Sequence, residues 1–242
     1  ITATTINTIN GYTTGTVTTT ATTIEGSVAN IETALGNSVA AGADGILYSV
    51  TLAGANALVA TVTDTSVDAE ALNDVDGLTE GLVTCSSATT VTGTRAEVQA
   101  ALTANVHVVN DEGTVTTQQT IAGLNTVNVT LSDDSVAVAN IRTMMGTVNF
   151  TGKITATVNE GTADALTHAD TGLTGTGHAL TVTMSDASAT AAELNAINAT
   201  TTVQVTLDSD GDGGDAITSV ESSAYADVLT LFQNCLLYTS DA

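Results

Sequence analysis

The residues best suited to chemistry form an acidic run from Asp208 to Asp215, with the sequence Asp-Ser-Asp-Gly-Asp-Gly-Gly-Asp. Carboxylates at alternate positions followed by glycine match the first half of a calcium-binding loop, in which hard oxygen ligands surround the ion. The second half departs from the EF-hand pattern, because Ser219 stands where that loop has its bidentate glutamate. Two interpretations stay open: a solvated acidic turn, or a Ca²⁺ site whose predicted ligands are Asp208, Asp210, Asp212 and Asp215, with Glu221 as an alternative to the last.

The histidines and cysteines give weaker chemical signals. His168, Asp170 and His178 have the residue types of a metal trio, whereas the alternative places the histidines, His107 included, on the surface or in loops rich in glycine and threonine. Cys85 is predicted to be a small buried apolar residue. Because the sequence contains no G-x-S-x-G, H-E-x-x-H or phosphate-loop motif, we predict no catalytic or cofactor-binding residues and a protein that is not an enzyme.

Threonines recur in alternating pairs, and the two members of each pair would face the same side of a strand. Rows of such pairs on a flat array would resemble an ice-binding surface. The alternative is that threonine is the β-branched polar residue preferred on exposed strands. The pairs are Thr18 with Thr20, Thr61 with Thr63, Thr155 with Thr157, and Thr181 with Thr183.

Composition excludes several classes of partner. The 242 residues include 3 Lys plus Arg against 26 Asp plus Glu, a formal net charge of -23, so phosphate contacts to nucleic acid and binding to anionic membranes are disfavoured. Hydrophobic residues make up 43% of the chain, which is enough apolar surface for folding. No apolar stretch is long enough to span a bilayer, so membrane insertion is not expected.

Internal repeats organise the elements that would position these residues. Four six-residue segments align without gaps, with starts 66, 69 and 53 residues apart: Ile6–Gly11, Leu72–Gly77, Ile141–Gly146 and Leu194–Ala199. We call these segments the hexamer motif. An aspartate stands eight residues before each of the last three copies, at Asp64, Asp133 and Asp186.

A second motif falls between the copies of the first. Ala21–Ser27 resembles Ala88–Thr94, and each leads into a stretch that contains alanine and valine, with weaker copies at Ile154–Leu166 and Ile217–Leu229. Each long repeat therefore holds two half-repeats, and about eight half-repeats of roughly 25–40 residues fit the periods typical of solenoids. We predict one elongated array over 1–234, with long repeats near 1–59, 60–127, 128–180 and 181–234.

The local pattern predicts a short strand followed by a short helix in each half-repeat. Val129 and Leu131 should point inward and Thr130 outward, as Val182 and Met184 should around Thr183. Asp133 or Ser135 is expected to cap the helix that follows. Capping boxes are predicted at Thr94–Glu97 and Thr190–Glu193, and an apolar stripe at Ala191, Leu194 and Ile197.

These expectations define the fold class. Strands that alternate with helices usually run parallel, so we predict a strand-rich repeat solenoid of α/β type with short helices. The alternative is an all-β solenoid or sandwich in which the alanine-rich stretches form corners.

The repeat consensus, V-T-L-S-D-x-S-V-x-A-A-x-L-N-x-I-N-x-x-T-x-G-x-V, resembles repeats of very large secreted or cell-surface bacterial proteins, including RTX-like and adhesin-like exoproteins. The resemblance covers 1–234 and is clearest at 60–83, 129–148 and 182–205. It implies an extracellular or cell-surface location and a structural or adhesive segment. It also implies neighbouring repeats of the same longer chain and a cell-surface or extracellular molecule as partners. The alternative function is a calcium-dependent or ice-binding extracellular module.

The two ends of the sequence give a further expectation. The chain opens with Ile1 rather than Met, which predicts that it was cut from a longer protein. The last eight residues, Cys235–Ala242, resemble translated sequencing-adapter read-through. We therefore expect 235–242 to be a non-native tail.

Overall fold

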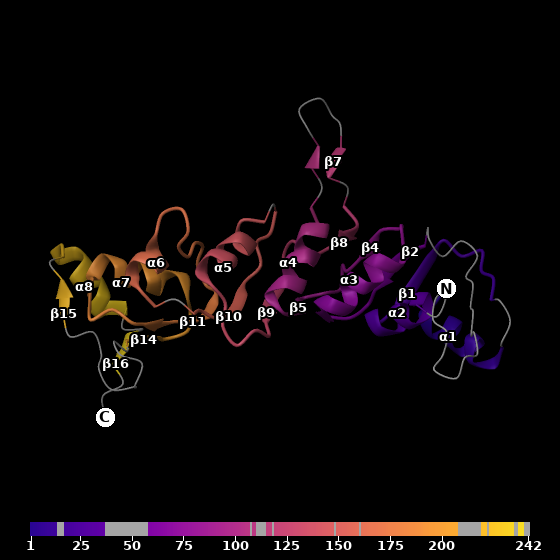
Figure 1. Ribbon diagram of the computed structural model, residues 1–242, viewed down its shortest axis with the longest axis horizontal. Helices are drawn as coiled ribbons and strands as arrows, with labels where there is room; N and C mark the ends of the chain where they lie inside the picture. The colour runs from indigo at the N-terminus through magenta and orange to yellow at the C-terminus, as the bar shows by residue number, and fades with distance from the viewer. Residues whose placement is uncertain are drawn as a thin grey trace. The chain divides into compact units, whose positions relative to one another are not determined.

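The computed structural model describes residues 1–13, 17–36, 58–106, 108–109, 115–117, 119–147, 149–159, 161–207, 219–221, 223–234 and 237–239. This part of the chain is α/β, with eight short helices and mostly parallel strands (Figure 1). The predicted α/β class is confirmed, and the all-β alternative is wrong. None of the described helices is long and apolar enough to cross a membrane.

The chain divides into two compact regions. The first contains Ile1–Asn128 and Thr147–Gly152, and the second contains Val129–Gly146 and Lys153–Ala242. Each region is described below by itself.

The first compact region contains four helices and eight strands among its described residues. The helices are α1 (Ala3–Tyr12), α2 (Val28–Gly36), α3 (Ala69–Leu78) and α4 (Arg95–Ala104). The strands are β1 (Thr23–Gly26), β2 (Val59–Val62), β3 (Ser66–Asp68), β4 (Val83–Thr84), β5 (Thr90–Gly93), β6 (Val108–Val109), β7 (Val115–Thr117) and β8 (Ile121–Ala122). Strands β1, β2, β4 and β8 form one parallel sheet in that order, β3 pairs with β5 in parallel, and β6 with β7 is antiparallel.

The second compact region repeats the same plan. Its helices are α5 (Val138–Met145), α6 (Ala163–Thr167), α7 (Ala191–Thr200) and α8 (Tyr225–Asn234). Its strands are β9 (Asn128–Leu131, whose first residue belongs to the first region), β10 (Ile154–Thr157), β11 (Ala179–Thr181), β12 (Thr183–Met184), β13 (Ser188–Thr190), β14 (Val205–Leu207), β15 (Ser219–Glu221) and β16 (Leu237–Thr239). Parallel pairing gives the orders β9-β10-β11, β12-β14-β16 and β13-β15.

Successive helices pack side by side. In the first region α1 contacts α2, α2 contacts α3 and α3 contacts α4, and in the second α6 contacts α7 and α7 contacts α8 (Figure 1). Helices of at most ten residues are marginal alone, so contacts of this kind and packing on the strands hold these helices in place. We call each strand with the helix that follows it a strand–helix unit.

The predicted strand register is confirmed. The inward side chains have exposed fractions of 0 to 8%, and the threonines between them are exposed. The buried residues are Val129, Leu131, Val182 and Met184, and the exposed ones are Thr130 and Thr183.

The two predicted capping boxes and the predicted apolar stripe are also confirmed. Thr94 and Thr190 begin α4 and α7 as N-caps, and each forms a complete capping box with the glutamate three residues later. The stripe of Ala191, Leu194 and Ile197 is buried. These short-range hydrogen bonds satisfy backbone N–H groups that a helix start leaves without partners.

The predicted cap of α5 is wrong. Neither Asp133 nor Ser135 occupies the N-cap position, which belongs to Ala137, a residue whose side chain makes no capping hydrogen bond. Strand β9 ends at Leu131, and an isolated parallel bridge at Val136 precedes the helix. Helix α5 begins only after this bridge, at Val138, so that Asp133 lies too far along the chain to cap it.

Candidate functional site

The hexamer motif places an asparagine between neighbouring helices. Its second position is asparagine in three of the four copies, and each asparagine donates from Nδ2 to a backbone carbonyl of the next helix. The bonds join Asn7 to Asn30, Asn73 to Glu97 and Asn195 to Asp227, at 3.0, 3.0 and 2.8 Å. They connect α1 to α2, α3 to α4 and α7 to α8, and we call them the asparagine contacts.

Arginine replaces asparagine in the remaining copy of the motif. The guanidinium of Arg142 donates to the carbonyl oxygen of Gly172 through Nη1 and to that of Ala169 through Nη2, both at 2.8 Å. A planar guanidinium offers several donors in fixed directions, so it can bind two carbonyls at once. The same motif position therefore contacts the following unit in all four copies.

The aspartate before the hexamer motif contacts the unit that precedes it. Asp64 accepts from the backbone N–H of Val28 at 2.6 Å, and Asp186 accepts from that of Ala163 at 2.5 Å. Val28 and Ala163 are the first residues of α2 and α6. The strand register explains the first contact, because Gly26 pairs with Val62 and two further residues bring Val28 beside Asp64.

A serine makes an equivalent contact at the start of α7. Ser223 Oγ accepts from the backbone N–H of Ala191 at 2.9 Å. An N–H at a helix start has no partner within its own helix, and a carboxylate there also interacts favourably with the helix dipole. Side chains of a following unit thus complete the caps of preceding helices.

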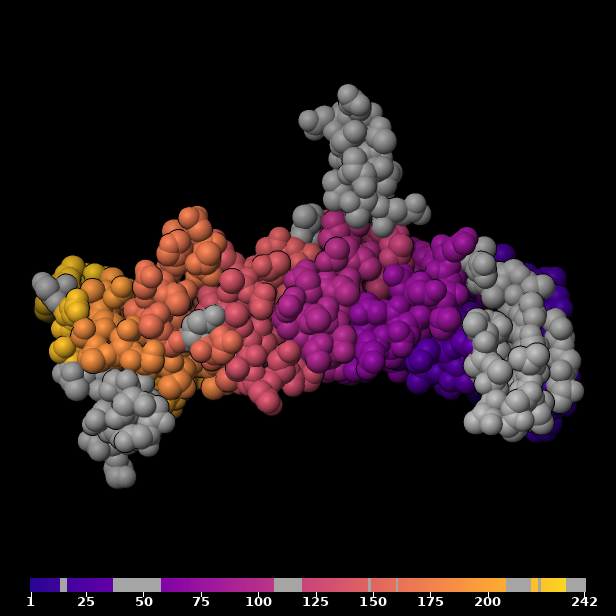
Figure 2. Space-filling model, viewed as in Figure 1, coloured from indigo at the N-terminus to yellow at the C-terminus, as the bar shows by residue number. Residues whose placement is uncertain are grey.

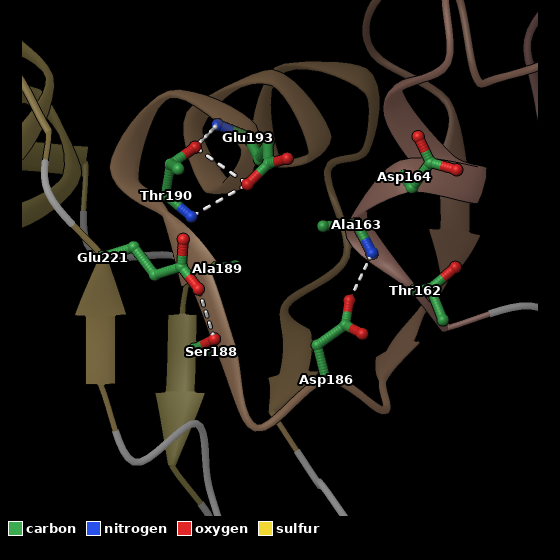
Figure 3. Close-up of a pocket in the computed structure, with 9 residues that line it drawn as sticks. All are labelled: Thr162, Ala163, Asp164, Asp186, Ser188, Ala189, Thr190, Glu193 and Glu221. Atoms are coloured by element: carbon green, nitrogen blue, oxygen red, sulfur yellow. Dashed lines mark hydrogen bonds between the residues drawn. The ribbon is translucent and has the colours of Figure 1, made fainter.

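A cleft in the second region lies among these contacts (Figure 3). It has a volume of about 230 Å³ and is formed by residues of α6, β13, α7 and β15 with the chain between them. Its lining includes four carboxylates and no lysine, arginine or histidine: Thr162, Ala163, Asp164, Asp186, Ser188, Ala189, Thr190, Glu193 and Glu221.

Three of these carboxylates already accept hydrogen bonds from nearby donors (Figure 3). Asp186 accepts from Ala163, as above. Glu193 Oε2 accepts from both N and Oγ1 of Thr190 at 2.8 Å, and Glu221 Oε1 accepts from Ser188 Oγ at 2.7 Å. Their roles are thus helix capping and strand pairing, and their combined charge favours cations over anions in the cleft.

The proposed calcium ligands Asp208, Asp210, Asp212 and Asp215 lie outside the described residues, as do His107 and Cys235. Within the described ranges, no group of three or more His, Cys, Asp or Glu side chains could hold a metal ion. The structure therefore does not assemble the suggested trio of His168, Asp170 and His178. His168 is exposed, and its Nδ1 accepts from the backbone N–H of Asp170 at 3.2 Å.

His178 is buried, which contradicts its interpretation as a surface or loop histidine. The residue is 5% exposed, and Nδ1 accepts from the backbone N–H of Ile154 at 3.1 Å. Burial, and secondarily the charge of Lys153, lowers the pKa of His178 below its ordinary value of 6.5. Gly175 has a φ of 76°, and a Cβ there would lie 2.8 Å from Nε2, so this turn against the ring requires glycine.

Cys85 is the apolar core residue that its context predicts. It is fully buried, and burial together with the nearby Asp64 charge raises the pKa of its thiol to about 12. The thiol is therefore protonated at neutral pH, whereas a cysteine nucleophile reacts as the thiolate.

Sequence reasoning missed the asparagine contacts. The available signal was an asparagine at one fixed motif position, but its partners lie 23, 24 and 32 residues away in the chain. Comparison with protein-family models, curated proteins and solved structures found no significant match for this chain.

Proposed function

We propose that the chain is a non-enzymatic structural or adhesive repeat segment of a large extracellular bacterial protein. One observation carries the proposal: the residues that recur with the repeat make contacts between neighbouring strand–helix units. Asn73 reaches the next helix, and Asp64 reaches the preceding one. The recurring polar residues therefore serve to join neighbouring units, which is the role expected of a structural repeat segment.

The contact energies favour a mechanical role. A neutral hydrogen bond contributes about 1 kcal/mol, and one to a charged group about 1.5–3 kcal/mol. The hydrogen bonds of Asn73 and Asp64 therefore each add a small stabilising free energy to that of the apolar packing between helices. In repeat proteins, such nearest-neighbour terms determine how far disruption of one unit spreads to the next.

Charge supports an extracellular setting. A formal net charge of -23 repels other acidic surfaces and keeps the chain soluble. The Debye length shortens to about 3 Å at 1 M salt, so saline surroundings would suppress repulsion between units. The proposed partners are neighbouring repeats and a molecule at a cell surface.

A pulling experiment tests the structural role. The full chain, tethered at both ends in optical tweezers, should unfold in repeated steps. A unit of 24 residues, the separation of the paired strands β3 and β5, should release at most about 80 Å. Asn73→Ala should lower the force of one step, and exposed Asp74→Ala serves as the matched control.

Retention of coated beads under flow tests the adhesive role. Beads that carry the chain should stay on bacterial cells or solid supports longer than beads coated with an acidic protein of similar charge. The proposal fails if the chain extends without resistance and the coated beads also wash off like the control.

The second candidate is an ice-binding module, which one observation favours. Thr157 pairs in register with Thr181 on parallel strands, and both side chains are exposed. Thr155 is exposed as well, but its register partner on β11 is Ala179, which interrupts the row. Inhibition of ice recrystallisation by the chain, lost in Thr157→Val with Thr181→Lys, would favour this candidate over the first.

A further inference from the structure

The buried ring of His178 takes the place of a backbone acceptor between two parallel strands. Farther along the same pair of strands, the N–H of Val158 donates to the carbonyl oxygen of Thr181 at 2.9 Å. The same separation along the chain would give Ile154 the carbonyl of Gly177. Ile154 is fully buried, and its N–H donates instead to Nδ1 of the ring at 3.1 Å. Because a buried backbone N–H without a partner is costly, the start of β10 depends on this ring.

The backbone of His178 joins the chain that follows α7. Its N–H donates to the carbonyl oxygen of Thr200 at 3.1 Å, and its carbonyl oxygen accepts from the N–H of Thr202 at 2.7 Å. Thr200 is the last residue of α7, and an isolated parallel bridge pairs His178 with Thr201. One residue therefore connects β10, through its side chain, to the end of α7, through its backbone.

A surface turn closes over the ring, and we call residues 174–177 the cover turn. Gly175 and Thr176 are exposed, and a Cβ on Gly175 would lie 2.8 Å from Nε2 of the ring. The ammonium group of Lys153 donates to the carbonyl oxygen of Thr176 and holds the turn in place. Arg142 binds two carbonyls earlier in the same segment. Figure 2 shows the orange atoms of the chain between α6 and β11 at the surface of the second compact region.

The surroundings of the ring disfavour a positive charge on it. Burial lowers the pKa of His178, and the like charge of Lys153, the titratable group that faces the ring, lowers it further. Strands β10 and β11, the cover turn and residues 200–202 contain no titratable side chain. His168 and Asp170, earlier in the segment, are exposed. No carboxylate of the elements around the ring therefore compensates a proton added to it.

We propose that His178 is an acid-sensitive latch, which holds the cover turn and the start of β10 together at neutral pH and releases them in mild acid. Because Nδ1 accepts a hydrogen bond, the neutral ring carries its proton on Nε2. A second proton converts Nδ1 into a donor that faces the N–H donor of Ile154. Opening of the cover turn brings the charged ring to water, while Arg142 keeps the earlier part of the segment attached. The latch does not depend on the adhesive role.

Native-state hydrogen exchange followed by NMR tests the proposal on the full chain. The exchange rate of the Ile154 amide, compared with its intrinsic rate at each pH, gives its protection. Protection should fall about tenfold for each pH unit between 6.5 and the folded-state pKa of the ring, and should level off below that pKa. The amide of Thr202 should follow. The amide of Ala60, in β2 of the first region, should keep its protection because no part of the latch lies there.

Two glutamine variants separate the latch from other effects of acid. The side-chain oxygen of His178→Gln can accept from the N–H of Ile154 but does not titrate, so protection of Ile154 in this variant should not change with pH. His168→Gln changes an exposed histidine of the same segment and should behave like the wild type.

Three results would overturn the proposal. They are a constant protection of Ile154 in the wild type between about pH 7.5 and 5, an equal loss of protection at Ala60, and a pH dependence that His178→Gln retains. If His178→Gln does not fold, the carbon resonances of the wild-type ring report its tautomer and charge. A charged ring while Ile154 stays protected would then contradict the latch.

Discussion

Removal of one asparagine contact should have a cost that can be worked out from its surroundings. Asn73 Nδ2 donates to the carbonyl oxygen of Glu97 at 3.0 Å, between α3 and α4. Asn73→Ala removes this bond and leaves the carbonyl without that donor, so we expect a loss of about 1–2 kcal/mol in the free energy of unfolding. For a chain of this size, the melting temperature should fall by about 2–4 °C for each kcal/mol.

The same substitution at the equivalent positions should cost less. Among the described residues, the Oδ1 atoms of Asn7 and Asn195 are buried without a hydrogen-bond partner, whereas that of Asn73 is not. An unsatisfied buried acceptor costs about 1–3 kcal/mol, and alanine removes that cost together with the favourable bond. Asn7→Ala and Asn195→Ala should therefore change stability by less than Asn73→Ala does.

Urea unfolding followed by circular dichroism measures these differences. Exposed Asp74, next in the chain, provides the control, because substitutions at such surface positions usually stay within about 0.5 kcal/mol. The reasoning is refuted if Asn73→Ala costs no more than Asp74→Ala. It is also refuted if the three asparagine variants rank in the reverse order.

Three further predictions concern the core, the buried histidine and the acidic loop. Leu131→Ala should lower the free energy of unfolding by about 2–5 kcal/mol in urea titrations, and a loss below about 0.5 kcal/mol would contradict the inward register. The folded-state pKa of His178 lies below 6.5, so the unfolded chain binds more protons as pH falls. The contribution of His178 to the free energy of unfolding should therefore be full above pH 6.5 and should decline between pH 6.5 and that lower pKa. The His178→Gln variant should lose this decline, whereas the His168→Gln variant should keep it. In calorimetry, calcium at millimolar concentration should raise the melting temperature more than magnesium does, and a chelator should lower it. The double variant Asp210→Asn with Asp212→Asn should abolish the difference between calcium and magnesium. If calcium has no effect on the native sequence, the solvated turn is favoured.

Short-range patterns in the sequence determined the elements themselves. Alternation around Val129 and Thr130 places apolar side chains inward because successive side chains of a strand point to opposite faces. The capping box at Thr94 and Glu97 forms because its donors and acceptors lie within one turn of the same helix. Such features depend only on residues a few positions apart, so the sequence alone predicts them.

Tertiary structure decided the partners of the recurring polar residues. Asp64 accepts from Val28, 36 residues earlier in the chain, because parallel pairing of β1 and β2 brings these two residues together. His178 is buried because a glycine turn at Gly175 lies against its ring while Nδ1 meets Ile154. Strand register and helix packing set these distances, and neither is encoded in the spacing of the residues along the chain.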